Sequence, residues 1–453
     1  MDLTDRKVLI VGLARTGEAL CRFLLRRGAR VRVSEKKSED AFGGRIARWK
    51  ELGADFETGG HRLESFLGSD LIVLSPGVPP LAEVDAAVRA GIPVISEIEL
   101  AYGFLKGTII GISGSNGKST TSTLVHKVLK DAGRRSFLAG NIGTPLISFV
   151  DRSRDEDIYV TEISSFQLEH IKDFRVGVSA VLNISQNHLD WHKSFDNYFA
   201  AKKKIVLGQD KAGFAVLNRD DALVWALRSE AAAAVYAFSR RRPVARGACL
   251  EDGRIVIRDG KKIPLMKASD IRLPGLHNLE NVLAASVIGH ILGVPARVMR
   301  ESIRGFKGLE HRLEDVRTIK GVLFVNDSKA TTVDATTKAL ISFNRPIVLI
   351  LGGKDKGGDF TLLRKPVKAR VRKVLLIGQA ADKIRAALEG VVPIETVSSF
   401  RELVRHGFES ASRGDVVLLA PACTSWDMFN NFEERGRTFK REVRALARKV
   451  EGA

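Results

Sequence analysis

Residues 111–120 read Gly-Ile-Ser-Gly-Ser-Asn-Gly-Lys-Ser-Thr, and this stretch is the strongest local signal in the chain. An apolar run precedes it, and apolar residues at helical spacing follow it as far as Gly133. This order predicts a buried strand, a glycine turn and a helix. Backbone N–H groups and the positive end of the helix dipole would then surround a phosphate. Lys118 can reach phosphate oxygens there, and the Ser119 hydroxyl suits Mg²⁺.

The composition of the chain excludes several classes of protein. With 453 residues, 44% hydrophobic and 28% charged, the chain can bury several cores, so it is neither disordered nor fibrous. Its three cysteines are widely spaced, which favours a reduced compartment. We find no secretion signal and no apolar run of membrane-spanning length, and we therefore expect a cytoplasmic protein.

The charge balance favours anionic ligands. Lys and Arg number 72 against 53 Asp and Glu, a net charge of +19. Such an excess suits nucleotides, phosphorylated metabolites or nucleic acid. The chain has only four Tyr and four Trp, and no basic stripe carries interleaved stacking residues, which argues against a dedicated nucleic-acid binder.

The chain repeats a strand–turn–helix pattern in three successive units. Short apolar runs alternate with helical patterns, which predicts parallel sheets with right-handed crossovers. A hairpin is predicted around Asp259-Gly260. The predicted strands include 8–11, 31–33, 71–74, 93–95, 108–112, 158–161, 181–184, 322–325, 347–351, 374–377 and 416–419. The expected domain boundaries give domains 1–98, 99–309 and 310–453.

Three residues downstream of the glycine turn could complete a nucleotide site. Glu162 ends a predicted strand, where a carboxylate could bind Mg²⁺. His188 follows the next strand, and Lys202 lies on a predicted helix. Taken singly, each has an ordinary reading: a strand-end carboxylate, a structural histidine and a surface lysine.

The first unit carries a weaker signal. Residues 12–17, Gly-Leu-Ala-Arg-Thr-Gly, resemble a dinucleotide fingerprint with alanine at the second glycine position, and Glu35 ends the next strand. An acidic group there could bind ribose hydroxyls. Three readings stay open at this point: NAD, another nucleotide, or a tight turn without a ligand. The stretch Ser75-Pro76-Gly77 could line the same site.

Three polar loops follow strands in the last unit, at residues 326–331, 352–357 and 421–427. Their positions at strand carboxyl ends suggest an edge that faces a ligand. Cys423 is a candidate nucleophile, but its loop contains no histidine. A buried thiol is the favoured interpretation.

Taken together, these motifs resemble the Mur ligases, the ATP-dependent amino-acid ligases of peptidoglycan precursor synthesis, over essentially the whole chain. The motifs that carry the resemblance are residues 114–120, Gly140-Asn141-Ile142-Gly143, 162–168, His277-Asn278-Leu279-Glu280-Asn281, His311-Arg312, 326–331 and 429–436. The resemblance implies an α/β protein of three domains: a Rossmann-like N-terminal domain, a central P-loop ATPase-type domain and a Rossmann-like C-terminal domain. It also implies addition of D-glutamate to UDP-N-acetylmuramoyl-L-alanine through an acyl phosphate, by a monomer that binds no nucleic acid.

The resemblance assigns the ATP and metal residues. It implies that Lys118, Glu162, His188 and Lys202 are catalytic, with two Mg²⁺ ions held by Ser119, Glu162, His188 and Lys202. Lys202 would act as its CO₂ adduct, since a carbamate turns a cation into an oxygen ligand, and this chemistry requires a neutral lysine. The implied ATP-binding residues are Gly114, Ser115, Asn116, Gly117, Lys118, Ser119, Thr120, Asn281, Arg312, Asp327 and Lys329.

The resemblance also assigns substrate contacts. Five residues of the first unit would contact the UDP part of the precursor: Arg15, Thr16, Glu35, Lys36 and Gly77. Asn141 would contact the rest of that molecule. The amino-acid pocket would contain Thr331, Lys356, Ser425 and the Phe432 loop, with Ser164 and Trp426 as further substrate contacts.

The alternatives fit the sequence less well. A folylpolyglutamate synthetase has its nucleotide loop much nearer the start of the chain. A diamino-acid-adding Mur ligase would show an Asp-Asn-Pro-Arg loop, which is absent, and the alanine-adding enzyme has His where Asn116 stands. A basic P-loop protein that binds nucleic acid is the alternative from another class.

Overall fold

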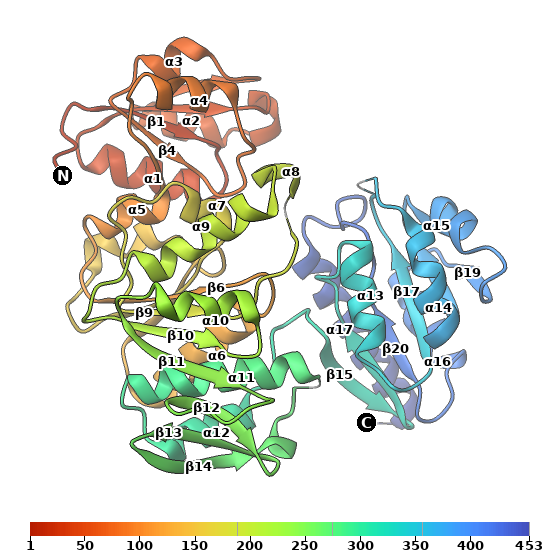
Figure 1. Cartoon of the computed structure of the whole chain (residues 1–453). Helices are drawn as coiled ribbons and strands as arrows, with labels where there is room; N and C mark the ends of the chain where they lie inside the picture. The colour runs from red at the N-terminus through yellow and green to blue at the C-terminus, as the bar shows by residue number, and fades with distance from the viewer. Residues whose placement is uncertain (188, 274, 356, 453) are drawn as a thin grey trace. The chain divides into compact units, whose positions relative to one another are not determined.

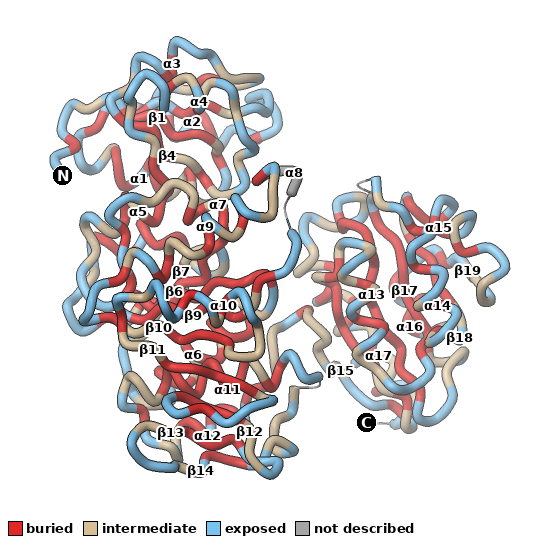
Figure 2. The backbone as a smooth tube through the Cα atoms, in the orientation of Figure 1, coloured by how far each residue is buried: buried red, intermediate tan, exposed pale blue. Residues whose placement is uncertain are grey.

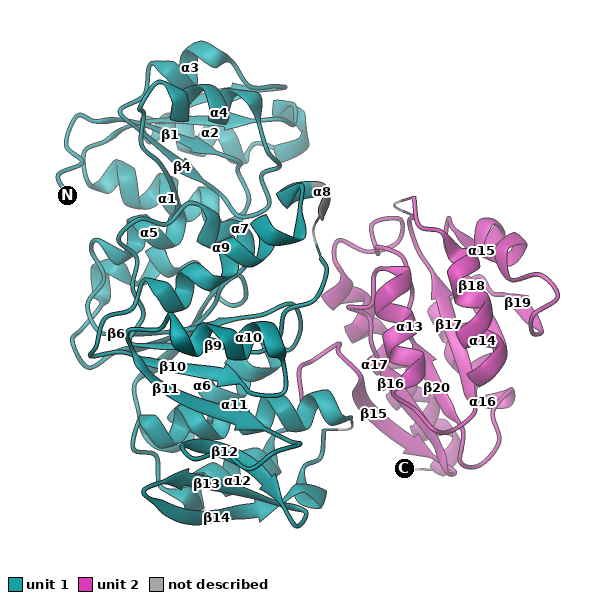
Figure 3. Ribbon diagram, in the orientation of Figure 1, with its two compact units in different colours: residues 1–306 teal, residues 307–453 magenta. Residues whose placement is uncertain are grey.

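The computed structural model describes residues 1–187, 189–273, 275–355 and 357–452. His188 and Lys356, two of the predicted site residues, therefore lie outside the described residues. The chain divides into two compact units, residues 1–306 and 307–453 (Figure 3). Among the described residues, no helix has the length and apolar character needed to cross a membrane.

The first unit begins with a fully parallel five-stranded sheet (Figure 1). In the order β3-β2-β1-β4-β5, its strands are β3 (Asp55–Thr58), β2 (Arg30–Glu35), β1 (Lys7–Val11), β4 (Leu71–Leu74) and β5 (Val94–Ser96). The connecting helices are α1 (Arg15–Arg26), α2 (Arg45–Glu51), α3 (Leu63–Leu67), α4 (Ala82–Arg89) and α5 (Glu97–Tyr102). Alternate residues of β1 pack on opposite faces: Val8 and Ile10 join the core with α1, and Leu9 and Val11 join α3 and α4.

A nine-stranded sheet forms the rest of the first unit, in the order β14-β13-β12-β11-β10-β9-β6-β8-β7. Its strands are β6 (Thr108–Ser113), β7 (Ser136–Gly140), β8 (Ile158–Glu162), β9 (Val178–Val181), β10 (Phe214–Asn218), β11 (Ala234–Ser239), β12 (Gly247–Glu251), β13 (Arg254–Asp259) and β14 (Lys261–Lys267). In this order, neighbouring strands from β12 through to β7 are parallel, and β13 and β14 form the expected antiparallel hairpin. The central strands β6, β8, β9, β10 and β11 are buried along most of their length, whereas the edge strands β7 and β14 are only partly buried (Figure 2).

The helices around this sheet are α6 (Lys118–Asp131), α7 (Ser165–Glu169), α8 (Leu189–His192), α9 (Phe195–Leu207), α10 (Ala222–Ala226), α11 (Leu276–Ile291) and α12 (Ala296–Gly305). Ile110 and Ile112 of β6 pack against α6 and α11, whereas Ile109 faces the core shared with the first sheet. A short 3₁₀ helix (Leu146–Arg152) joins the two sheets, because Glu97 accepts a 2.7 Å hydrogen bond from Ile147 N.

One predicted strand is wrong in its position. Residues 181–184 were expected to form a strand, but β9 spans Val178–Val181. Beyond Val181 the chain turns to the glycine loop instead: Leu182 N donates to Ser113 O at 3.0 Å, and Asn183 O accepts from Ser115 N at 2.9 Å. The apolar run is therefore divided between the sheet and a loop contact.

The second unit contains a six-stranded sheet in the order β15-β16-β20-β17-β18-β19. It comprises β15 (Glu314–Ile319), β16 (Val322–Asn326), β17 (Ile347–Gly352), β18 (Val371–Ile377), β19 (Ile394–Thr396) and β20 (Val416–Leu419), with β15 antiparallel at the edge. Its helices are α13 (Val333–Ile341), α14 (Arg364–Arg370), α15 (Ala381–Leu388), α16 (Phe400–Glu409) and α17 (Phe432–Glu451). The expected α/β architecture with three wound sheets is confirmed. Residue 98 lies within α5, and the domain limits at 98 and 309 stay a prediction.

Candidate functional site

The glycine loop between β6 and α6 has the predicted strand–turn–helix geometry. It runs from Ser113 to Lys118, the first residue of α6. Gly117 has φ +85°, and a Cβ there would lie 2.2 Å from the Oδ1 of Asn281. Glycine is required at this position because helix α11 comes so close to the loop. The loop is thereby set at the N-terminus of α6, where a phosphate is favoured.

The conformation of this loop is stabilised by hydrogen bonds with Tyr198, Asn183 and Ser185, which are not among the site residues predicted from the sequence. Ser115 Oγ lies 2.7 Å from the hydroxyl of Tyr198 and accepts a bond from Ser185 N at 2.9 Å. Asn116 N donates to the Oδ1 of Asn183 at 2.8 Å. Tyr198 lies one helical turn before Lys202 on α9, a spacing that places both side chains on one helix face. From this spacing, the sequence indicates that Tyr198 lies on the same helix face as Lys202.

Two lysines converge on the loop from different helices. Lys118 Nζ donates to Gly114 O at 2.8 Å, and Lys202 Nζ donates to the same carbonyl at 3.0 Å and to Ser113 Oγ at 3.2 Å. Lys202 is only 2% exposed. Its burial, with the charge of Lys118, lowers the Lys202 pKa well below the usual value, against the opposing effect of Glu162. The structure thus favours a neutral amine at Lys202.

Glu162 contributes a carboxylate at the end of β8, next to β6. Its Oε1 accepts a 2.7 Å bond from Asn141 Nδ2. Its Oε2 is buried and has no hydrogen-bond partner among the described residues. A buried carboxylate oxygen without a donor is costly unless a cation or another donor meets it. The Ser119 hydroxyl on α6 is also buried. The Glu162 carboxylate and this hydroxyl offer oxygen ligands, which Mg²⁺ prefers.

Further predicted residues lie on the surrounding elements. Ser164 caps α7 in a capping box with Gln167, so its hydroxyl is engaged by the helix. Asn281 is buried, accepts from Thr121 Oγ1 at 3.3 Å and donates to Asn278 Oδ1 at 3.1 Å. The contacts predicted for Ser164 with substrate and for Asn281 with ATP stay predictions.

In the five-stranded sheet, the Glu35 carboxylate is engaged in hydrogen bonds with backbone N–H groups of nearby loops. Its carboxylate accepts from Leu13 N at 2.8 Å and from Lys37 N at 3.1 Å. Ser75 Oγ donates to Gly12 O at 2.8 Å, which joins the loops after β1 and β4. Glu35 thus fixes the loop geometry, and a contact with a sugar hydroxyl stays a prediction.

The other predicted contacts for UDP belong to the same edge of this sheet. The strand order reverses between β1 and β4, and ligands of open α/β sheets bind at such a switch point. Arg15 and Thr16 begin α1 directly after the β1 loop, Lys36 follows β2, and Gly77 follows β4. All four are exposed or half-buried, so they are accessible to a ligand.

In the second unit, a buried arginine joins the loops after β16 and β20. Arg435 on α17 is 1% exposed. Its guanidinium donates to Ser328 Oγ and O at 2.9 and 2.8 Å and to Cys423 O at 3.1 Å. The burial of Cys423 raises its thiol pKa to about 12, which agrees with a structural thiol rather than a nucleophile. Arg435 belongs to the motif of residues 429–436, but the motif alone predicts no role for this side chain.

The predicted amino-acid-pocket residues lie around this arginine. Phe432 O accepts from Ser328 Oγ at 2.8 Å, and Ser425 is buried two residues after Cys423. Thr331 belongs to the loop after β16, whereas the Trp426 side chain is mostly exposed. These placements are compatible with a common ligand-facing edge, and the individual contacts stay predictions.

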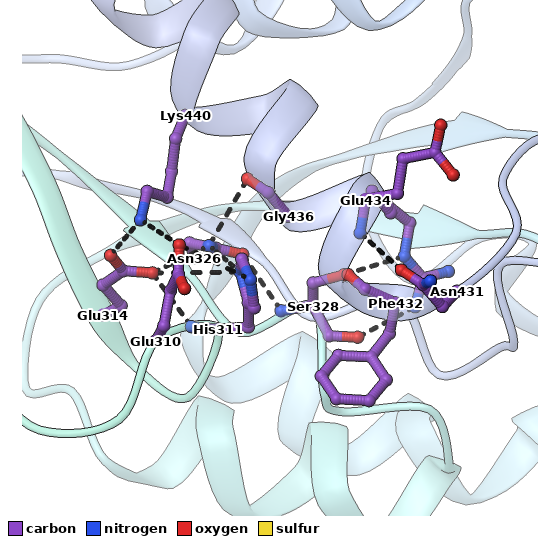
Figure 4. A network of polar contacts seen from close by, with 11 residues as sticks. Glu310, His311, Glu314, Asn326, Ser328, Asn431, Phe432, Glu434, Gly436 and Lys440 are labelled. Carbon is purple, nitrogen blue, oxygen red and sulfur yellow. Dashed lines mark hydrogen bonds and ion pairs between the residues drawn. The ribbon is translucent and has the colours of Figure 1, made fainter. Parts of the chain in front are cut away.

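A polar network around Asn326 fixes the segment that carries Arg312 (Figure 4). Asn326 Nδ2 donates to His311 Nδ1 at 2.9 Å and to Glu314 Oε2 at 3.0 Å. Because Nδ1 accepts, the proton of neutral His311 belongs on Nε2. Burial lowers the His311 pKa, which favours that neutral form. The backbone around Arg312 is thereby tied to β16.

This network is not suited to a metal, although Glu310, His311 and Glu314 offer ligand atoms within 4.8 Å of one another. Lys440 Nζ lies 2.8 Å from Glu310 Oε1 and 2.6 Å from Glu314 Oε1, so one ammonium group already occupies an oxygen of each carboxylate and offsets one of their two negative charges. The protonated Nε2 of His311 cannot act as a ligand.

Next to the network, Asp327 is a buried carboxylate at the end of β16. Burial raises its pKa to about 6, against the opposing charges of Arg312 and Lys329. The three predicted ATP-binding residues of the second unit therefore lie near one another. Their contacts with the nucleotide stay predictions.

Models of one protein family match most of the chain. The Mur ligase MurD-like N-terminal domain matches residues 6–96, the Mur ligase middle domain matches 112–289, and the Mur ligase, glutamate ligase domain matches 311–423. A protein of Acidobacterium capsulatum named UDP-N-acetylmuramoylalanine–D-glutamate ligase is 46% identical over 444 residues, covering 97% of this chain and 96% of that protein. A protein of the same name from Caldanaerobacter subterraneus subsp. tengcongensis is 43% identical and covers 99% and 100%.

Solved structures share the fold at lower identity. The UDP-N-acetylmuramate-alanine ligase of Thermotoga maritima has a TM-score of 0.58 at 19% identity, covering 97% of this chain and 100% of that chain. The MurF ligase of the same organism, in complex with ADP, has a TM-score of 0.55 at 18% identity, covering 98% and 97%. With full-length relatives at these identities and three domain models in order along the sequence, this chain belongs to the Mur ligase family.

Proposed function

We propose that this chain joins the amine of D-glutamate to the carboxylate of UDP-N-acetylmuramoyl-L-alanine, with cleavage of ATP to ADP and phosphate, in peptidoglycan precursor synthesis. The names of the full-length relatives support these substrates. The observation that carries the proposal is the cluster, around the glycine loop, of Lys118, Lys202 and a Glu162 Oε2 that has no hydrogen-bond partner in the described part of the chain. This cluster combines the Lys118 cation for phosphate with a buried carboxylate and a neutral lysine for the metal.

The chemistry follows from an acyl phosphate. The precursor carboxylate attacks the γ-phosphorus of ATP, the bond to ADP breaks, and a mixed anhydride forms. The free amine of D-glutamate then attacks the acyl carbon, the amine loses a proton, and phosphate leaves from the tetrahedral intermediate. Lys118 and the N–H groups of the loop would neutralise charge on the transferring phosphoryl group. No nucleophilic side chain is needed, and the buried Cys423 thiol has no role in these steps.

Glu162 and Ser119 would hold Mg²⁺ on the ATP phosphates, and Lys202 with His188 would hold a second ion. The bound metal supplies positive charge to phosphate oxygens during transfer. Lys202 contributes through its neutral amine, whose nitrogen can form a bond to the carbon of CO₂ and lose a proton to solvent, which gives a carbamate with two oxygen donors. The depressed pKa and the burial of Lys202 support this role.

The remaining predicted contacts complete the proposal. Arg15, Thr16, Lys36 and Gly77 would bind the UDP part at the edge of the five-stranded sheet, with Glu35 as support for the loop. The second unit would supply the amino-acid pocket between the loops that Arg435 joins. We further propose a monomer that acts in the cytoplasm, which light scattering and cell fractionation would test.

Phosphate release tests the proposed reaction. The protein is incubated with Mg²⁺, ATP and the UDP precursor against a panel of D- and L-amino acids, and the products are weighed by mass spectrometry. The proposal expects one phosphate per product and a mass gain of one glutamate residue with D-glutamate alone. Equal turnover with L-glutamate, or with a diamino acid, would contradict the proposed specificity.

A further inference from the structure

The second unit contains an open surface cavity of about 320 Å³ that is lined by four exposed arginines. Arg441 lies at the middle of α17, Arg444 and Arg448 lie in its C-terminal half, and Arg317 comes from the middle of the edge strand β15. The spacing of the three helix residues places them on one face of α17. Phe439, Val443 and Ala447 occupy the buried face that packs on the sheet.

The cationic charge at this cavity is only partly compensated. Arg317 is paired with Glu451 at 2.8 Å, and Arg441 with Glu442 at 3.2 Å. The described residues provide no carboxylate within ion-pair distance of the side chains of Arg444 and Arg448. Four guanidinium groups therefore face two carboxylates, which leaves a net positive cavity that attracts anions.

Helix electrostatics do not account for this arrangement. Cations in the last turn of a helix are favoured by its dipole, which explains Arg448 and Lys449. The dipole does not explain Arg441, more than two turns from the end, nor Arg317, which comes from a strand. An array of arginines from two elements around one cavity is typical of recognition of phosphate groups, because the guanidinium fork binds two phosphate oxygens at once.

We infer that this cavity binds a soluble ligand with two or three linked phosphate groups, at a site separate from the ATP centre. The cavity residues begin nine positions after Phe432, roughly 14 Å along the axis of α17. They do not overlap the residues predicted for ATP or the amino acid. Such a site would use part of the net charge of +19 that the proposed reaction leaves unexplained.

Inorganic tripolyphosphate is a suitable probe, measured on the full chain with saturating ADP to occupy the glycine loop. Hydrogen–deuterium exchange with mass spectrometry locates the binding, and calorimetry gives the affinity. We expect protection of peptides that contain residues 314–319 and 437–452. Sodium sulfate at matched ionic strength should give no such protection, because isolated sulfate ions lack linked charges.

Charge reversal separates specific binding from general attraction. The double variant Arg444→Glu/Arg448→Glu should weaken tripolyphosphate binding at least tenfold and remove the protection. The double variant Lys365→Glu/Lys368→Glu on α14 changes the net charge by the same amount at two exposed positions away from the cavity, and should alter the affinity less than twofold.

Three results would overturn the inference. These are equal weakening by both double variants, protection confined to the glycine loop, or equal protection by sulfate. Hydrogen–deuterium exchange of the unaltered protein with tripolyphosphate tests the inference even if the Arg444→Glu/Arg448→Glu protein fails to fold. Anionic phospholipid vesicles form a separate arm, and protection of the cavity by vesicles without tripolyphosphate binding would also refute a soluble ligand.

Discussion

The buried carboxylate of Glu97 should make the stability of the first unit depend on pH. Glu97 begins α5 and is 1% exposed, and its Oε1 accepts a 2.7 Å bond from Ile147 N in the 3₁₀ helix that joins the two sheets. Burial raises its pKa from 4.5 to about 7, only partly opposed by the backbone hydrogen bonds of Ile147 and Leu146. The folded protein therefore binds a proton that the unfolded chain releases.

The size and sign of the effect follow from this difference in pKa. The stabilising contribution is complete below pH 4.5 and is lost as the pH rises through about 7. At about 1.4 kcal/mol per pH unit, the free energy of unfolding should fall by about 3 kcal/mol over that window. The variant Glu97→Gln cannot ionise, so its stability should lack this decline.

Urea unfolding of the protein and the variant at pH 5 to pH 8.5 measures the difference. Trp49, Trp191 and Trp225 report on the first unit by fluorescence. The variant Glu99→Gln is the matched control on the same helix, because Glu99 accepts bonds from Lys172, Asp173 and Phe174 backbone N–H groups. A pH dependence that is identical in the protein and in Glu97→Gln would refute the reasoning.

Three further predictions concern the site. Lys202→Ala should abolish phosphate release, and formate or acetate should restore part of it, because the proposed carbamate is needed only as an oxygen donor; full activity without an additive would contradict the carbamate. Arg435→Met should lower the free energy of unfolding of the second unit by about 3 kcal/mol in urea, because buried carbonyl oxygens of Ser328 and Cys423 lose their hydrogen-bond donors. A decrease within about 0.5 kcal/mol, which is typical of a surface substitution, would show that the loops do not depend on Arg435. Asn326→Leu should raise the KM for ATP more than it lowers kcat, because His311 and Glu314 no longer fix the backbone around Arg312; an unchanged KM would refute that positioning role.

The sequence predicted the parts of the site that depend on local order. The glycine loop needs only a strand, a turn and a helix start in succession, and its position was correct. Glu162 was placed at the end of its strand because the apolar run 158–161 stops there. Lys202 was correctly placed on a helix, but its burial depends on the packing of α9 against the loop.

The parts that failed depend on contacts between distant residues. The partner of Ser115 is Tyr198, 83 positions away, and the partner of Arg435 is Ser328, 107 positions away. No local pattern encodes such pairs, so Arg435 and the Asn326 network were missed, and the spacing of Tyr198 from Lys202 could place it on the same helix face but could not reveal its contact with Ser115. The apolar run 181–184 was assigned wholly to a strand because periodicity cannot separate a sheet residue from a buried loop residue such as Leu182.

We propose that the buried Glu162 carboxylate holds the metal of the ATP centre. The most direct measurement is the Mg²⁺ concentration that gives half-maximal phosphate release in Glu162→Gln and in Glu169→Gln, a nearby carboxylate on α7. Our account predicts at least a tenfold higher Mg²⁺ requirement for Glu162→Gln and little change for Glu169→Gln. An unchanged Mg²⁺ requirement in Glu162→Gln would contradict the account.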